Sequence, residues 1–240
     1  MIITKNIGDQ WAKGTGIFET IRVEDNQVFA LHRHHCRAKE AAAKLGIEIP
    51  AEEIVASESY QIIQNEKIKL GRLRWHFDIS GNFSISYVQF SDPVTDAKLM
   101  IFDERHSDFE LKNKEFPYKN LELLNRAKSL NFDDGIMIRS DGQVAETSMA
   151  SLLLKIENQW VTPPLSSGIL NGVVRALVLE ANLAQVRRVD FKDLEKVESG
   201  LLLTSLRNAQ IIGSIAGRSL ILDNQKCAEI HKLMQQFKGR

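Results

Sequence analysis

The sequence predicts an α+β protein in two parts, and two observations lead to this fold class. Strand patterns occur in groups joined by short turns, which is typical of antiparallel hairpins. Helical patterns interrupt these groups without the regular strand–helix alternation of a parallel sheet, so a dinucleotide-binding fold is not expected. A charged, aperiodic stretch separates the parts. We therefore expect an N-terminal α/β domain over residues 1–105, an interdomain connection over 106–118 and a C-terminal domain over 119–240.

The first part opens with a predicted hairpin. Residues 17–23 follow a period of two, and Glu24, Asp25 and Asn26 supply a polar turn. Two helices and three strands are expected next, with the helices at 38–47 and 52–66 and the strands at 72–80, 83–90 and 97–102. The first of these helices should end near Gly46, because glycine readily adopts the left-handed conformation that stops a helix.

The second part is predicted to begin and end with a helix. Its helices are expected at about 119–130, 171–183 and 224–237, and its strands at 135–139, 151–156, 159–163, 185–191 and 200–205. Polar turns at residues 140–142 and 157–158 separate the first three of these strands. Short turns between successive strands favour antiparallel pairing in this part as well.

Composition and charge limit the class of protein. The chain has 31 basic and 31 acidic side chains, so net charge steers it toward neither nucleic acid nor an anionic membrane. No apolar stretch approaches the ~18 residues that suggest a membrane helix, and no signal peptide is recognisable. Two cysteines, Cys36 and Cys227, do not make a disulfide scaffold. A cytoplasmic protein with a small-molecule partner is expected.

Three histidines and a cysteine crowd into five residues, at His32, His34, His35 and Cys36. On a helix, His32 and Cys36 would share one face, as two ligands of a metal do. No second paired cluster elsewhere in the sequence completes a tetrahedral site. A polar helix start is therefore the favoured interpretation, and no metal is expected.

Four separated segments together resemble one enzyme family. They are GTGIFETIRV, followed after a hairpin by HHCR; YKNLELLNRAK; DGQVAETSMASLLL; and TPPLSSGILNGVVRALVLE. In residue types and order they are similar to segments of the fold-type IV pyridoxal-phosphate enzymes, which share the two-domain fold of D-amino-acid aminotransferase. The family includes branched-chain and D-amino-acid aminotransferases and 4-amino-4-deoxychorismate lyase. The resemblance covers most of the chain and implies a pyridoxal 5′-phosphate cofactor and a homodimer with its sites at the dimer interface.

The resemblance implies the main chemical roles for Lys119 and Glu146. Lys119 stands where the family has the lysine that forms a Schiff base with the cofactor and then shuttles protons. Glu146 stands where a carboxylate keeps the pyridine nitrogen protonated, which makes the ring an electron sink. Taken alone, Lys119 reads as a solvated lysine at a helix start and Glu146 as a glutamate at a strand end.

The cofactor phosphate is expected to meet a helix start and a guanidinium. A helix is predicted just after Gly172, where backbone N–H groups attract an anion and glycine permits close approach. Arg37 matches the arginine of the family's HxxR element, and a guanidinium suits phosphate well. The other cofactor contacts that the resemblance implies are Val173, Val174, Ser205 and Leu206.

Several positions favour the lyase among the family's reactions. Phe18 and Leu124 resemble the lyases where D-amino-acid and branched-chain aminotransferases, respectively, have tyrosines. The segment LTSLRNAQIIG is similar to one common in the lyases, and it makes Arg207 an expected substrate contact, as is Phe18. The expected reaction converts 4-amino-4-deoxychorismate to 4-aminobenzoate and pyruvate in folate biosynthesis. Arg72 and Arg74 are further candidates for substrate carboxylates, although exposure along a strand is the favoured explanation of both.

Some positions depart from the family pattern and leave alternatives open. Ser151 replaces the family's asparagine, the segment between Lys119 and Asp134 is short, and the lyases' RG-rich loop near Gly81 is missing. A class IV aminotransferase acting on D- or branched-chain amino acids is the first alternative. A non-catalytic binding protein with the same fold is the second, and retention of both Lys119 and Glu146 speaks against it.

Overall fold

The structure is a computed structural model that describes residues 3–5, 16–106 and 118–239. It divides into two compact units: unit 1 is Met1–Asp92 with Met234–Arg240, and unit 2 is Pro93–Leu233. The boundary between the two units, after Asp92, therefore lies before the connection expected at residues 106–118. The reason is that strand β6, Ala97–His106, pairs with strands of unit 2.

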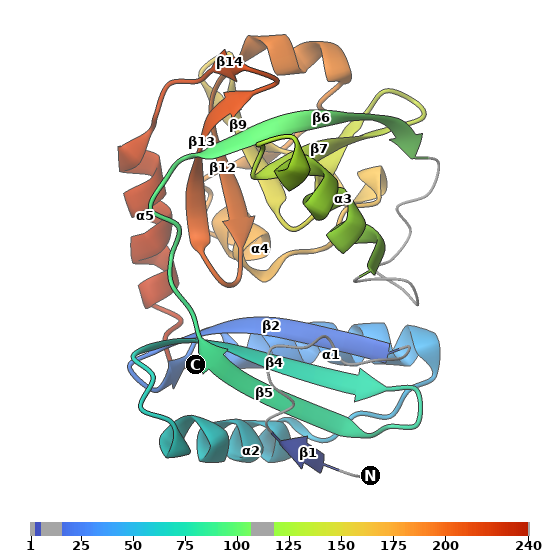
Figure 1. Cartoon of the computed structure of the whole chain (residues 1–240), viewed down its shortest axis with the longest axis vertical. Coiled ribbons are helices and arrows are strands. Elements are labelled where there is room, and N and C mark those ends of the chain that lie inside the picture. Colours follow the sequence, from blue (N-terminus) through green and yellow to red (C-terminus); the bar gives the residue numbers. More distant parts are fainter. Residues whose placement is uncertain (1–2, 6–15, 107–117, 240) are drawn as a thin grey trace. The chain divides into compact units, whose positions relative to one another are not determined.

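Unit 1 contains a five-stranded sheet and two helices (Figure 1). Its strands are β1 (Ile3–Lys5), β2 (Gly16–Glu24), β3 (Gln27–Val28), β4 (Leu70–Asp78) and β5 (Phe83–Gln89), and its helices are α1 (Leu31–Leu45) and α2 (Glu52–Asn65). The spatial order is β1-β5-β4-β2-β3. Only the β1–β5 pair is parallel in this sheet, so the predicted antiparallel character is confirmed.

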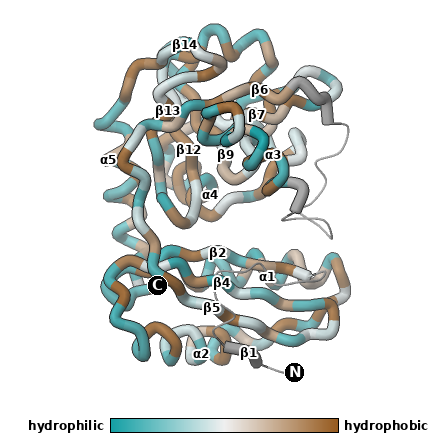
Figure 2. The backbone as a smooth tube through the Cα atoms, viewed as in Figure 1, coloured by the Kyte–Doolittle hydropathy of each residue, from teal (hydrophilic) through white to brown (hydrophobic). Residues whose placement is uncertain are grey.

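One face of this sheet packs against both helices and makes the core of unit 1. In β4, Leu73, Trp75 and Phe77 are fully buried on that face, and they join apolar residues of α1 and α2 in one cluster. The residues between them lie on the opposite face, because side chains alternate along a strand. The indole Nε1 of Trp75 donates to Ser59 Oγ of α2 at 2.9 Å, which satisfies both buried polar groups. Figure 2 shows the resulting alternation of hydropathy along the chain.

The predicted hairpin of unit 1 is confirmed, and the helix after it is longer than expected. Asp25 and Asn26 have φ of 50° and 62°, as a tight hairpin turn requires. Helix α1 begins at Leu31 instead of residue 38 and ends before Gly46, whose φ is 67°. Polar residues concealed its start, since its buried positions follow a helical period and are Leu31, His34, His35, Ala38 and Ala42.

Unit 2 is built on a nine-stranded sheet. Its strands are β6 (Ala97–His106), β7 (Asp134–Arg139), β8 (Val144–Thr147), β9 (Ser151–Ile156), β10 (Gln159–Thr162), β11 (Gln185–Val186), β12 (Val197–Thr204), β13 (Asn208–Ile215) and β14 (Arg218–Ser219). The order is β11-β10-β9-β12-β13-β6-β7-β8, and β14 pairs with β13. The helices are α3 (Tyr118–Ser129), α4 (Val173–Glu180) and α5 (Asn224–Gln235), with short 3₁₀ turns at Leu165–Ser167 and Phe191–Lys196. Mixed helix and sheet in both units confirm the α+β class.

Strands β8 and β13 of unit 2 were not expected from the sequence, and neither was the two-residue β14. Strand β8 has only four residues, all buried, so it lacks the alternation that reveals a strand. Strand β13 begins with Asn208, Ala209 and Gln210, which read as loop residues but are buried. In both cases the pairing partner, rather than the local pattern, determines the strand.

The strand expected at 185–191 is wrong over most of its length. Only Gln185 and Val186 pair as β11, and a 3₁₀ turn begins at Phe191. Asp190 and Asp193 form a capping box at the start of this turn, and side-chain caps of this kind compete with strand pairing.

Across the described ranges of the chain, no helix is both long and apolar enough to span a membrane.

Candidate functional site

Glu146 lies in β8 as a buried carboxylate, with 4% of its surface exposed. The backbone N–H of Leu170 donates to Glu146 Oε1 at 3.2 Å. Burial lowers the pKa of the Arg175 guanidinium, and the charge of Glu146 acts against this lowering. The two opposite charges therefore stabilise each other inside unit 2. A carboxylate in such a position can hold a protonated ring nitrogen.

Lys119 is the second residue of α3, and its side chain lies outside the described residues. The next residue, Asn120, uses its amide Nδ2 to donate a hydrogen bond of 2.5 Å to the Ser148 carbonyl. Ser148 belongs to the turn that follows β8 and its Glu146. Further along α3, the buried Ala127 lies in an apolar cluster with residues of β6, β7 and β8. The structure thus ties the segment bearing Lys119 to the strand bearing Glu146.

The start of α4 forms a cradle suited to an anion. Gly172 is the N-cap, and its carbonyl accepts the first intrahelical bond, from the N–H of Ala176 at 2.9 Å. The N–H groups of Val173 and Val174 precede that bond and point out of the helix start. A Cβ added at Gly172 would come within 3.0 Å of Ser151 Oγ, so only glycine leaves this space open.

The turn between β12 and β13 adjoins this cradle. Ser205 and Leu206 lie in the turn, and β12 pairs with β9 so that Leu203 is opposite Ser151. The Ser151 side chain in turn faces Gly172. Helix α4 also packs on β12. Five predicted contacts of the cofactor and the hydroxyl of Ser151 are therefore grouped at one end of these strands; the five are Gly172, Val173, Val174, Ser205 and Leu206.

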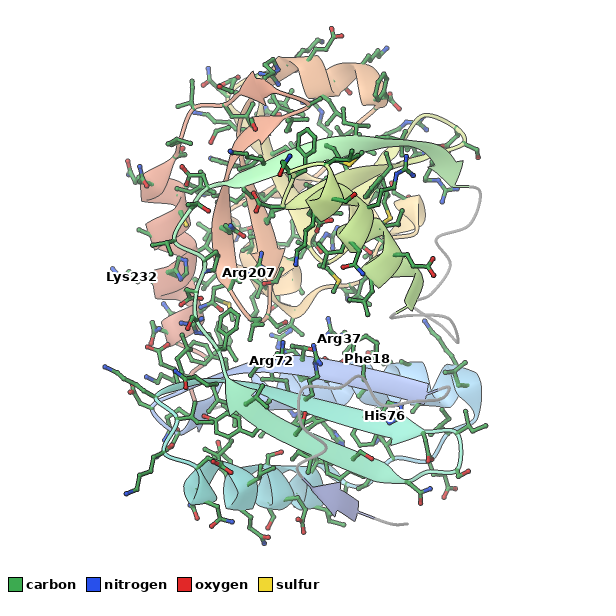
Figure 3. The ribbon with its side chains drawn as sticks, viewed as in Figure 1. Phe18, Arg37, Arg72, His76, Arg207 and Lys232 are labelled. Atoms are coloured by element: carbon green, nitrogen blue, oxygen red, sulfur yellow. The ribbon has the colours of Figure 1, made fainter. Side chains whose placement is uncertain are left out.

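Arg207 occupies the last position of the same turn, as labelled in Figure 3. Its backbone N–H donates to Thr204 Oγ1 at 3.0 Å. Its guanidinium Nη1 donates to Gln210 Oε1 at 2.7 Å. These two bonds order both the backbone and the head of the side chain, so the position of the cation beside this turn is fixed.

Arg37 belongs to unit 1 and is held by a buried glutamate. Its Nε donates to Glu19 Oε1 at 2.9 Å, and its Nη2 bonds Glu19 Oε2. His34 Nδ1 bonds the same carboxylate at 2.6 Å. Burial opposes ionisation of Glu19, but the charge of Arg37 and the bond from His34 prevail and lower the pKa of Glu19 to about 2. Because two of the five N–H groups of Arg37 engage Glu19, the guanidinium has a fixed orientation.

Replacing Glu19 by glutamine should remove part of the acid sensitivity of unit 1. The folded-state pKa is lowered from 4.5 to about 2, so ionised Glu19 stabilises the fold above pH 4.5. That contribution, about 3 kcal/mol, is lost as pH falls from 4.5 toward 2. We expect Glu19→Gln to be less stable at pH 7 and to show a flatter decline in acid, measured by urea unfolding. Glu53→Gln on the exposed surface of α2 is the control, and an unchanged acid slope for Glu19→Gln would contradict the prediction.

Phe18, Arg72 and Arg74 lie on the sheet face of unit 1 that is opposite the helices, and Figure 3 labels Phe18 and Arg72. The register of β2 and β4 places Phe18 beside His76. Burial, together with the charge of Arg72, lowers the pKa of Arg74 to about 10. Both arginines are half-buried and alternate along β4 with the fully buried Leu73 and Trp75. Their contact with substrate carboxylates stays a prediction.

The side chains of the histidine cluster contact several different groups, and Glu52 Oε2 lies near both His32 and His35. His32 Nδ1 bonds Glu52 Oε2 at 2.7 Å and lies beside Cys36, while His35 Nε2 bonds the Pro50 carbonyl at 2.9 Å. His34 Nδ1 bonds Glu19 Oε2, the buried carboxylate of β2. Within the ranges that the structure describes, no group of three or more histidine, cysteine or acidic side chains is arranged to hold a metal ion.

Three residues of this region were not singled out as site residues from the sequence. Ser151 was noted only as a departure, although its hydroxyl faces Gly172. Arg175 ends the ILNGVVR segment, and that position in the motif was a usable signal for its link to Glu146. Asn120 gave no signal beyond standing next to Lys119, because its partner is 28 residues away.

Comparison with known proteins gives a family model described as amino-transferase class IV, which matches residues 16–215. A Schizosaccharomyces pombe protein provisionally named aminodeoxychorismate lyase is 26% identical over 174 residues, covering 69% of this chain and 74% of its own. A Rickettsia conorii protein provisionally named a branched-chain-amino-acid aminotransferase is 23% identical over 252 residues, covering 92% and 85%.

Solved structures show the same fold. A Legionella pneumophila protein provisionally named 4-amino-4-deoxychorismate lyase has a TM-score of 0.84 at 18% identity, over 98% of this chain and 99% of that one. A hypothetical aminotransferase of Mycobacterium tuberculosis in its PLP-bound form has a TM-score of 0.77 at 18% identity, over 93% and 90%. At these identities the likeness concerns the fold, while the match to the family model concerns the sequence itself.

Proposed function

The chain belongs to the class IV aminotransferase family, and from this membership we propose that it is an aminodeoxychorismate lyase. The proposed reaction converts 4-amino-4-deoxychorismate to 4-aminobenzoate and pyruvate, a step of folate biosynthesis. The Schizosaccharomyces pombe and Legionella pneumophila proteins support this choice within the family. Family membership alone, without the choice of reaction, assigns an enzyme whose cofactor is pyridoxal 5′-phosphate, as in the PLP-bound neighbour.

The described residues of unit 2 fit this cofactor. The phosphate suits the start of α4, where the absence of a side chain at Gly172 leaves room beside Ser151 Oγ. The ring nitrogen suits Glu146, which is buried and has the cationic Arg175 nearby. Arg37 of unit 1 is the proposed guanidinium contact of the phosphate. When bound, the cofactor supplies an electron sink for the electron pair that a departing proton leaves behind.

Lys119 is the proposed catalytic residue. Its amine removes a proton from the substrate ring and holds it while the carbon–oxygen bond to the departing three-carbon group breaks. The same amine then returns the proton to that group, which leaves as pyruvate. The two products together contain all the atoms of the substrate, so neither water nor an oxidant is consumed. The protein therefore has to position one amine and orient the substrate.

The position of Arg207 is the observation that carries the lyase over an aminotransferase. Arg207 lies in the turn that also bears Ser205 and Leu206, and its guanidinium is bonded to Gln210 of β13. An ordered guanidinium there offers a site for a carboxylate beside the proposed phosphate cradle. The proposed substrate has two carboxylates, whereas a branched-chain amino acid has one. Phe18 is the proposed apolar contact of the substrate ring.

Formation of 4-aminobenzoate is the direct test of this proposal. The protein is mixed with chorismate, glutamine and a purified aminodeoxychorismate synthase, and a parallel reaction omits it. We expect 4-aminobenzoate well above the control and pyruvate in equal amount. A yellow, cofactor-loaded protein that forms no product would rule out the lyase, and a colourless one that takes up no cofactor would point to a binding role.

An aminotransferase is the second candidate, and the Rickettsia conorii relative favours it. Such an enzyme would change its absorption spectrum on addition of a D- or branched-chain amino acid alone, and the original spectrum would return on addition of a keto acid.

A homodimer is part of the proposal, because the resembling enzymes build their sites at a dimer interface. Light scattering of the purified protein measures this property independently of activity.

A further inference from the structure

A buried carboxylate, Asp134 at the start of β7, holds the turn that joins β8 to β9. Asp134 Oδ1 accepts hydrogen bonds from Ser148 Oγ at 2.6 Å, the Ser148 N–H at 3.1 Å and the Gly135 N–H at 2.7 Å. Its Oδ2 accepts the N–H of Met149 at 3.2 Å. Burial raises the pKa of Asp134, while these hydrogen bonds act against the rise. Three of the four donors come from two consecutive residues, so this carboxylate orders one turn.

The same turn is also closed from within. The Thr147 N–H donates to the Ala150 carbonyl at 2.9 Å, and the Ala150 N–H donates to Thr147 Oγ1 at 2.9 Å. Thr147 and Ser148 are completely buried. The Ser148 carbonyl therefore has a fixed place, and it accepts the side-chain amide of Asn120 in the first turn of α3.

We propose that Asn120 and Asp134 are positioning residues that hold Lys119 at a fixed place relative to Glu146. Asn120 directly follows Lys119, and Ser148 lies two residues after Glu146 in the chain. The hydrogen bonds run from Asp134 through the turn to the start of α3 and remain within unit 2. The inference rests on the proposed role of Lys119 as the cofactor lysine, and it is independent of the choice between lyase and aminotransferase.

A positional role is expected from elementary properties of helices. The first turn of a helix has backbone N–H groups without intrahelical partners, so it opens more easily than the middle. The apolar residues that anchor α3 in its cluster are Leu123 and the buried Ala127, which lie one and two turns further along the helix. A displacement of about 1 Å in a reacting group can reduce a rate roughly 100-fold. The Asn120 bond supplies a restraint at the end of the helix where Lys119 lies.

Asn120→Ala is the direct test, with Asn125→Ala as the matched control on an exposed position of the same helix. Both variants are loaded with pyridoxal 5′-phosphate, and the pH midpoint of the visible absorption band is measured without substrate. We expect Asn120→Ala to move this midpoint by about half a unit or more, because the lysine nitrogen leaves its place. We also expect kcat to fall ~10-fold or more with KM little changed. Asn125→Ala should match the unsubstituted protein.

A double-mutant cycle with Asp134→Asn tests whether both residues act through one turn. Residues that act through the same element have non-additive effects. The double variant should therefore lose less activity than the product of the two single losses. If Asp134→Asn does not fold, Asn120→Ala alone decides the matter. An unchanged midpoint and an unchanged kcat in folded Asn120→Ala would overturn the inference. The proposed function would still stand after that result if Lys119→Ala loses the absorption band.

Discussion

Lys119→Ala is expected to abolish turnover while the protein remains folded. Lys119 is the proposed proton carrier, and removing such a group costs about 10²- to 10⁴-fold even when other contacts remain. Loss of the covalent link to the cofactor adds to this cost, since the same amine serves both purposes. Lys119 lies in the first turn of α3, whereas the helix residues in the apolar cluster, Leu123 and Ala127, come later in the helix, so the core should be undisturbed. The measurement is the rate of 4-aminobenzoate formation, together with thermal unfolding.

Lys128→Ala provides the matched control for this experiment. Lys128 is exposed in the last turn of the same helix, so its removal changes the charge of α3 without touching the proposed site. We expect this variant to retain full activity. Wild-type turnover in Lys119→Ala would show that the catalytic lysine is elsewhere, whatever reaction the enzyme performs.

The fold was predictable from sequence where local patterns determine it. In β4, apolar residues at alternate positions predicted the strand, and the structure buries Leu73, Trp75 and Phe77 on one face. Strand β8 could not be found in this way, because both of its faces are buried and its last two residues, Glu146 and Thr147, are polar. Its formation depends on pairing with β7, and such contacts leave no period in the sequence.

In the candidate site, too, some features follow from local sequence and others arise only from contacts between distant segments. The glycine before α4 was predicted from the motif, and the structure confirms a helix starting directly after Gly172. The hydrogen bonds of Asp134 join segments 14 or 15 residues apart, and that of Asn120 spans 28 residues. No propensity or spacing rule reports such pairs, because they arise only after the sheet has formed. The sequence therefore predicts which residues react, while the structure is needed to propose those that position them.

Glu146→Gln should yield a protein that binds the cofactor but reacts slowly. The amide keeps the volume of the buried side chain and can still accept the N–H of Leu170. It removes the negative charge that keeps the ring nitrogen protonated, so the electron sink weakens. We expect kcat to fall roughly 100-fold or more, with cofactor affinity changed much less. Absorbance titration with pyridoxal 5′-phosphate and the 4-aminobenzoate assay separate the two effects.

The same substitution should also lower stability, because Arg175 would lose a stabilising negative charge. Arg175 is 2% exposed, and the charge of Glu146 offsets part of the cost of burying this cation, so we expect Glu146→Gln to lower the free energy of unfolding. Glu157→Gln is the control, since Glu157 is an exposed carboxylate near Arg187 and Lys196 and its loss should change neither activity nor stability measurably. A Glu146→Gln protein with normal kcat would mean that another group protonates the ring. A protein with low kcat and unchanged stability would instead mean that the Glu146–Arg175 attraction is weak, while the catalytic role of Glu146 would stand.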